Sequence, residues 1–242
     1  MVLEVKELVK KYPKFELDKV SFFVREGTIM GFIGRNGAGK STTMKALLNQ
    51  VHPDAGEILF FGKSFTENEA EIKKQIAFVS GGISFYPKKT LKTITDVTKR
   101  FYDNWDEEAY ENYLKIFKLD DSKKADQLSE GMKVKYLLSI AMSHDARLLI
   151  LDEPTSGLDP VSREEVLDIF VYLVKQRKVS ILFSTHIISD LEKCADDITY
   201  IREGKIISST DVKSFIDCYS TTNQKLTLEE IMVNLEKETR LF

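Results

Sequence analysis

Residues 34–41 have the types and the spacing of a loop that binds phosphate. They match the pattern GxxxxGK[ST] in full, and they lie between an apolar run at residues 28–33 and a predicted helix. The glycines allow backbone N–H groups to face phosphate oxygens, and the helix N-terminus adds partial positive charge. Lys40 can reach the β- and γ-phosphates, and the Ser41 hydroxyl can bind Mg²⁺. The sequence therefore predicts a nucleoside triphosphate site.

Two adjacent carboxylates, Asp152 and Glu153, follow a second apolar run at residues 148–151. Asp152 can hold Mg²⁺ directly or through water, and Glu153 can polarise the water that attacks the γ-phosphate. A strand that ends in acidic residues is common, so this pair indicates a metal and catalytic site only in combination with the phosphate loop. Together the two motifs predict hydrolysis of a nucleotide bound with Mg²⁺.

Predicted strands alternate with predicted helices along the chain, which is typical of an α/β fold around a parallel sheet. One domain is expected over residues 1–242, with an inserted helical subdomain at about 83–145 and a short helical tail at about 210–242. Strands are predicted at residues 2–9, 20–24, 28–33, 58–61, 76–79, 148–151, 180–183, 198–202 and 205–208. Helices are predicted at residues 40–48, 67–74, 162–175, 212–218 and 228–235, and across residues 91–143.

The composition excludes several classes of protein. With 43% apolar residues and a net charge of −3, disorder and general nucleic-acid binding are both disfavoured. The two cysteines, Cys194 and Cys218, are too few for a disulfide scaffold and lack zinc-site spacing, so reduced thiols are expected. No signal peptide or membrane-spanning run is predicted, so any work at a membrane requires a partner.

A further motif, residues 128–132, opens a predicted helix before Asp152. The Ser129 hydroxyl and the Gly131 backbone N–H at a helix N-terminus would form a second phosphate-binding site. This segment resembles the Leu-Ser-Gly-Gly-Gln signature of ATP-binding cassette (ABC) ATPases, with the serine and the second glycine kept. The segment at residues 156–159 resembles the D-loop of that family, His186 resembles its switch histidine, and Tyr12 resembles the aromatic residue that stacks on adenine.

The resemblance spans about residues 2–235 and implies the fold and chemistry of the ATPase domain of an ABC transporter. It implies a P-loop NTPase core with a parallel sheet, an N-terminal antiparallel β-subdomain and an inserted helical subdomain. Glu153 and His186 would be catalytic, and Ser41 and Asp152 would bind Mg²⁺. Ser129, Gly131 and Asp159 would contact the ATP of an opposite subunit. The ATP contacts implied within the chain are Tyr12, Gly34, Arg35, Asn36, Gly37, Ala38, Gly39, Lys40, Ser41 and Thr42.

The chain departs from the family pattern at one position. Gly81 stands where the family has a glutamine that touches Mg²⁺ and the attacking water and links the site to the membrane subunit. Ser80 or Ser84 could substitute through water. We expect slower turnover than is usual in the family, and Gly81→Gln should raise the ATPase rate. No increase would count against this interpretation.

The motifs occur once each, so two complete ATP sites require two chains, most simply a homodimer, with a heterodimer as the alternative. The resemblance also implies a separate integral membrane subunit, which places the chain on the cytoplasmic face of the cell membrane. Residues 83–87 would line the groove that receives this subunit, or Phe85 and Tyr86 would pack inside. Residues 101–106, 152–159 and 226–231 resemble bacterial export cassettes, including those for drugs and antimicrobial peptides.

Two other functions remain as alternatives. An ABC ATPase that acts in translation or DNA maintenance would need a second cassette or a long coiled coil. The chain has one set of motifs, and the segment between Lys40 and Ser129 is short and without sustained heptads. A phosphate-loop kinase or GTPase would leave the motif at Ser129 and Gly131 unexplained, as well as His186.

Overall fold

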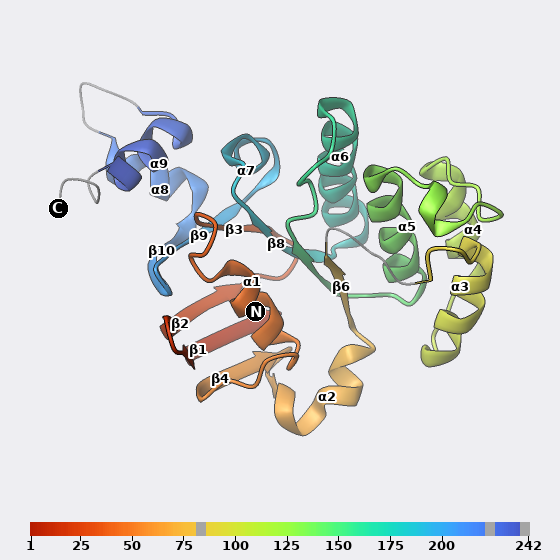
Figure 1. Ribbon diagram of the computed structural model, residues 1–242, viewed down its shortest axis with the longest axis horizontal. Coiled ribbons are helices and arrows are strands. Elements are labelled where there is room, and N and C mark those ends of the chain that lie inside the picture. Colours follow the sequence, from red (N-terminus) through yellow and green to blue (C-terminus); the bar gives the residue numbers. More distant parts are fainter. Residues whose placement is uncertain (81–85, 221–225, 238–242) are drawn as a thin grey trace.

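Two β-sheets organise the chain (Figure 1), as described by a computed structural model that covers residues 1–80, 86–220 and 226–237. The smaller sheet is antiparallel, with the strand order β2-β1-β4-β5. The larger sheet has the order β10-β9-β3-β8-β7-β6, and all neighbours in it are parallel except β9 and β10. The strands are β1 Leu3–Tyr12, β2 Phe15–Val24, β3 Ile29–Ile33, β4 Ala55–Phe60, β5 Lys63–Ser64, β6 Ile76–Ser80, β7 Leu148–Asp152, β8 Ser180–Thr185, β9 Asp197–Arg202 and β10 Lys205–Asp211.

The larger sheet is buried on both faces, which explains the near-continuous apolar runs in its strands. Alternate side chains of β3 enter different cores: Ile29 and Ile33 pack with the helices of one face, and Met30 and Phe32 pack toward the other. The second core joins helix α1 and the antiparallel sheet to the main sheet. The chain therefore has the α/β architecture of a P-loop NTPase, with an antiparallel sheet near its N-terminus.

Helices cover the sheet and form a cluster at one side of it, where α3, α4 and α5 lie (Figure 1). Buried hydroxyl groups hold this cluster together, because Thr95 of α3 hydrogen-bonds both Tyr110 of α4 and Tyr136 of α5, each at 2.9 Å. The α-helices are α1 Lys40–Leu47, α2 Phe65–Lys73, α3 Leu91–Thr98, α4 Glu107–Ile116, α5 Glu130–Ser143, α6 Pro160–Arg177, α7 Ile188–Cys194, α8 Val212–Tyr219 and α9 Leu228–Lys237. Two 3₁₀ turns, η1 Lys99–Phe101 and η2 Ala125–Gln127, connect them.

The strands and long helices that the sequence predicts are present, and their ends differ by a few residues. Two short elements were not predicted, the strand β5 and the helix α7. Helix α7 has seven residues, of which only Asp190 and Leu191 are buried, so it carries too little periodic apolar signal to be recognised. Gly81, Ile83, Ser84 and Phe85, on which several interpretations depended, lie outside the described residues.

Both cysteines are free thiols, as the sequence predicts, but their surroundings differ. Burial raises the pKa of Cys194 to about 12, whereas Cys218 is exposed. Because the thiolate is the reactive form, iodoacetamide at mildly alkaline pH should label Cys218 and spare Cys194 in the folded chain. Mass spectrometry of the digested protein measures this, and the guanidinium-unfolded chain, labelled at both positions, is the control. Equal labelling rates in the folded chain would contradict the burial of Cys194.

Within the part of the chain that the structure describes, no helix combines the length and the apolarity needed to cross a membrane.

Candidate functional site

The predicted site residues gather at the carboxyl ends of β3, β7 and β8. The register aligns these ends, because Ile33 pairs with Thr185 and Asp152 pairs with Ser184. In parallel sheets, ligands bind at this edge. The phosphate loop leaves β3 there, Glu153 follows β7, and His186 follows β8. Segments that are far apart in the sequence thus meet at one place.

The phosphate loop adopts the conformation that its glycines permit. Gly37 and Gly39 have φ values of 84° and 115°, and a Cβ on Gly39 would lie 2.9 Å from the ring of Phe15. The loop is supported from the β9–β10 turn, where Gly204 N donates to Ala38 O at 2.9 Å. Helix α1 begins at Lys40 directly after the loop, so its N-terminus faces the site.

Lys40 is almost fully buried, at 5% exposure, and its ammonium group is held inside the loop. Nζ donates to Gly34 O at 2.7 Å and to Arg35 O at 3.3 Å, and it pairs with Glu153 Oε1 at 3.2 Å. The carboxylate therefore occupies a position beside the ammonium group that phosphate oxygens would compete for. This geometry fits a lysine that changes partner when nucleotide binds.

Glu153 lies at the centre of the site. Its φ of 51° is unusual for a residue with a side chain. Its backbone N–H donates hydrogen bonds to Ser184 O at 3.2 Å and to Ser184 Oγ at 2.9 Å, which hold it in this conformation. Its Oε2 lies 2.8 Å from Nδ1 of His186. The Glu153 carboxylate also lines the cavity, which is the position that a general base for an attacking water requires.

Ser41 and Asp152 are hydrogen-bonded to each other, with Ser41 Oγ donating to Asp152 Oδ1 at 3.3 Å. A hydroxyl and a carboxylate oxygen are hard donors that suit Mg²⁺, which keeps water and phosphate oxygens as its remaining ligands. Among the described residues no group of three or more His, Cys, Asp or Glu forms a metal cluster. Ser41 and Asp152 thus supply two oxygen donors that fit Mg²⁺.

A cavity of about 660 Å³ opens at the phosphate loop, with Glu153 and His186 in its lining. Tyr12 is not among the described residues that line it; it is 43% exposed, and its ring centroid lies 6.5 Å from that of Phe15. Phe15 does line the cavity, so the ring nearer to the phosphate loop is one that the sequence analysis did not single out. The lining comprises Lys14, Phe15, Arg35, Asn36, Gly37, Gly39, Lys40, Ser41, Thr42, Glu153, Ser156 and His186.

Ser129, Gly131 and Asp159 are not part of that lining. Ser129 caps α5 by accepting from Met132 N at 3.3 Å, and Asp159 caps α6 by accepting from Val161 N and Ser162 N, each at 3.0 Å. The hydrogen bonds from Ser162 and Val161 lower the pKa of Asp159, so it stays ionised.

The two capped helix ends adjoin each other, because a Cβ on Gly131 would lie 3.1 Å from Ser162 Cβ. The residues predicted to contact a second nucleotide therefore lie close together at the starts of α5 and α6. Figure 1 shows these helices to one side of β3 and the phosphate loop.

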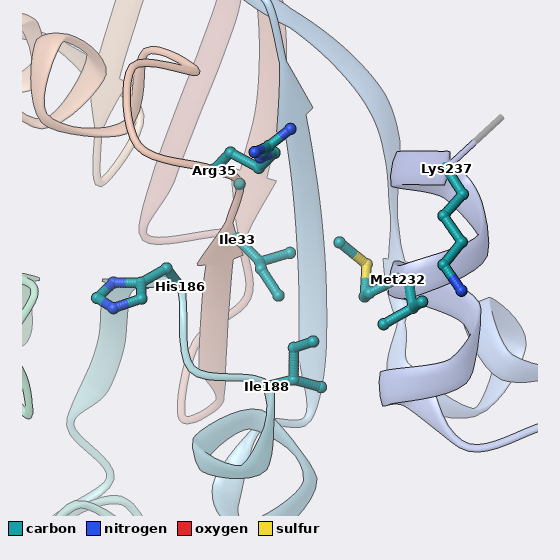
Figure 2. Close-up of a pocket in the computed structure, with 8 residues that line it drawn as sticks. Ile33, Arg35, His186, Ile188, Met232 and Lys237 are labelled. Carbon is teal, nitrogen blue, oxygen red and sulfur yellow. The ribbon is translucent and has the colours of Figure 1, made fainter. Parts of the chain in front are cut away.

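A second cavity, of about 310 Å³, lies between the phosphate loop, the segment after β8 and α9 (Figure 2). Figure 2 shows Met232 reaching from α9 toward Ile33 and Ile188, with Arg35 above Ile33 and His186 to its left. Because Arg35 and His186 line both cavities, α9 adjoins the site.

Ser184 is a site residue that sequence analysis missed. Its Oγ donates to Asp152 Oδ1 at 2.5 Å and accepts from Glu153 N, so it fixes both carboxylate-bearing residues. We expect Ser184→Ala to lower kcat about 10- to 100-fold, because both groups lose their alignment. A steady-state assay of phosphate release checks this.

The matched control is Ser180→Ala, which removes a buried hydroxyl at the opposite end of the same strand. A drop in kcat of the same size in both variants would attribute the effect to strand stability and contradict the role of Ser184.

The fold and the site define a phosphate-loop nucleoside triphosphatase, and the comparison with known proteins gives its family. The profile of the ABC transporter family matches residues 17–156, more than half of the chain, which therefore belongs to this family. It is an ATP-binding, ATP-hydrolysing subunit of an ABC transporter.

Among its relatives is the bacitracin transport ATP-binding protein BcrA of Bacillus licheniformis, 34% identical over 209 residues, 85% of this chain and 68% of the relative. A solved structure of an ATP-binding subunit of an ABC transporter is 28% identical with a TM-score of 0.85, over 98% of this chain and 100% of that one. The ATP-binding cassette MJ0796, solved as a dimer bound to ADP and Pi, is 19% identical with a TM-score of 0.73 and shares the fold over 87% of this chain and 98% of its own.

Proposed function

We propose that this chain hydrolyses ATP with Mg²⁺ at the site formed by the phosphate loop, Asp152 and Glu153, as one half of a two-chain ATPase that drives export through a separate membrane subunit. The observation that carries this proposal is the convergence of Lys40, Glu153 and His186, with Glu153 within 3.2 Å of Lys40 and 2.8 Å of His186.

In this proposal the residues have distinct tasks. Lys40 and the loop N–H groups hold the β- and γ-phosphates. Ser41 and Asp152 would hold Mg²⁺, which would supply positive charge beside the phosphates. Glu153 accepts a proton from the attacking water, and His186 orients Glu153 and contacts the γ-phosphate. Tyr12, or Phe15 at the cavity rim, stacks on adenine. Ser80 pairs with Asp152 across β6 and β7, where its hydroxyl could serve in place of the expected glutamine.

The second chain completes each site. The cavity at Lys40 is open, and the starts of α5 and α6 present Ser129 and the ionised Asp159 at the surface apart from it, with Gly131 buried beside them. Two copies related by a two-fold axis would place each such surface against the other's nucleotide. The relative solved as a dimer bound to ADP and Pi supports this arrangement.

Exposed apolar side chains on the helical cluster support a membrane subunit as the further partner. Tyr86 is 65% exposed, which argues against its packing inside, and Val97 and Phe101 are 49% and 71% exposed. The location on the cytoplasmic side of the membrane follows from this partner. The relative that serves bacitracin transport supports a drug or antimicrobial peptide as the cargo.

The test is to tag the chain, extract it from its own cells in mild detergent and identify what copurifies. An integral membrane protein in near-equal amount is the expected result. Ribosomes, DNA-repair proteins or no membrane protein would overturn the transporter proposal.

A second experiment tests whether the direction of transport is export. A strain that lacks the chain should become more sensitive to the exported antimicrobial, and a Lys40→Met copy should not restore resistance.

A further inference from the structure

The buried carboxylate of Asp190 lies outside the ATP cavity and accepts a hydrogen bond from the turn that follows Glu153. Asp190 is 1% exposed and lies in α7, the helix that follows His186. Thr155 Oγ1 donates a hydrogen bond to Asp190 Oδ2 at 2.5 Å, and Thr155 itself is fully buried. This bond therefore connects the segment of Glu153 with the segment of His186.

Asp190 also faces a third segment, the start of α6. Arg163 Nε lies 4.0 Å from Asp190 Oδ1, and Arg163 N donates to the backbone oxygen of Asp159 at 2.9 Å. The three segments that meet at Asp190 are thus those that carry Glu153, Asp159 and His186.

Burying the charged carboxylate of Asp190 at this position disfavours folding, because the charge loses its hydration. Burial raises the pKa of Asp190, and the hydrogen bond from Thr155 and the charge of Arg163 oppose that shift. Asp190 Oδ1 and Arg163 Nε make no hydrogen bond within the described part of the chain. Packing alone would favour apolar side chains of similar size, because partly satisfied buried charges rarely stabilise a fold. A role in alignment explains why charged side chains occupy these positions.

We propose that Asp190 is a positioning residue for ATP hydrolysis, which fixes the segments of Glu153, Asp159 and His186 in one relative arrangement. The inference rests on the proposed roles of Glu153 and His186. Their contact, 2.8 Å between Oε2 and Nδ1, joins the same two segments as the bond between Thr155 and Asp190. Loss of the buried bond should therefore loosen the contact in the site.

The experiment compares Thr155→Val, Asp190→Ala and the double variant by steady-state ATPase assay. Each single variant should lower kcat about 10- to 100-fold, since small misplacements of reacting groups have effects of this size. KM for ATP should stay within about threefold, because neither residue lines the phosphate cavity. The double variant should be no slower than the slower single variant, because the two side chains act as one unit. Thr155→Ser, which keeps the hydroxyl, should retain most of the rate.

The control is Lys193→Met, which removes exposed ion pairs from Lys193 of α7 to Glu164 and Asp168 of α6 and should leave kcat unchanged. Thr155→Val is nearly isosteric, so it keeps the test valid if Asp190→Ala does not fold. A wild-type kcat in Thr155→Val, or effects that multiply in the double variant, would overturn the positioning role. Normal hydrolysis by Glu153→Gln would instead overturn the proposed function.

Discussion

Glu153→Gln is expected to lower kcat about 10³-fold while ATP binding is kept, because an amide cannot accept the proton of the attacking water. The substitution also removes the ion pair with Lys40, at 3.2 Å, and leaves its ammonium group free for the phosphates. The affinity for ATP should therefore stay the same or rise. Phosphate release measures kcat, and calorimetric titration with ATP measures the dissociation constant.

The same variant should accumulate as an ATP-bound dimer, because the step that opens the two chains is blocked. Light scattering with saturating ATP and Mg²⁺ gives the mass. Glu111→Gln, an exposed change on α4, is the matched control and should behave as the parent chain does. Turnover within about tenfold of the parent would contradict the role of Glu153 as the proton acceptor. A monomer with ATP would argue against pairing of identical chains and leave a heterodimer.

Lys40→Met is expected to weaken ATP binding about 100-fold and to abolish turnover, because charge-assisted hydrogen bonds to phosphate are lost. Methionine has a similar length and no charge, so the buried position at 5% exposure should accept it. Titration with ATP and a thermal melt measure binding and stability separately. In contrast to Glu153→Gln, this variant should not form an ATP-dependent dimer.

Lys45→Met is the control for Lys40→Met, because Lys45 is exposed in the last turn of the same helix. Its ATP affinity should match that of the parent chain. An unchanged ATP affinity in Lys40→Met would exclude the phosphate loop as the main source of binding. If Lys40→Met melted far below the Lys45 variant, its loss of ATP affinity would be a consequence of impaired folding instead.

The parts of the site that local sequence specifies were predictable. The phosphate loop is one contiguous motif, and its glycine conformations are properties of the loop itself. Asp152 and Glu153 end an apolar strand, which is also a local pattern. Ser184 and Asp190 could not be found in this way, because each matters through a neighbour that the register of β7 and β8 or the packing of α7 brings near.

The position of the aromatic rings near the site could not be predicted from the sequence either. Tyr12 and Phe15 pair in register across the turn between β1 and β2, and the Phe15 ring lies against Gly39 of the phosphate loop. The sequence contains both rings, but only the fold determines that Phe15 lines the cavity and that Tyr12 is 43% exposed. The role of Tyr12 in stacking on adenine stays a prediction.

The order of strands in the larger sheet has a consequence for biosynthesis. β3 and β7 are not neighbours, and the space between them is filled by β8, which leaves the ribosome last of the three. Until residues 180–185 have emerged, the strand that pairs with both β3 and β7 is missing, and the packing of α1 with β7 is the contact left between the two segments. We therefore expect a nascent or truncated chain to align the phosphate loop with Asp152 only after β8 has joined the sheet.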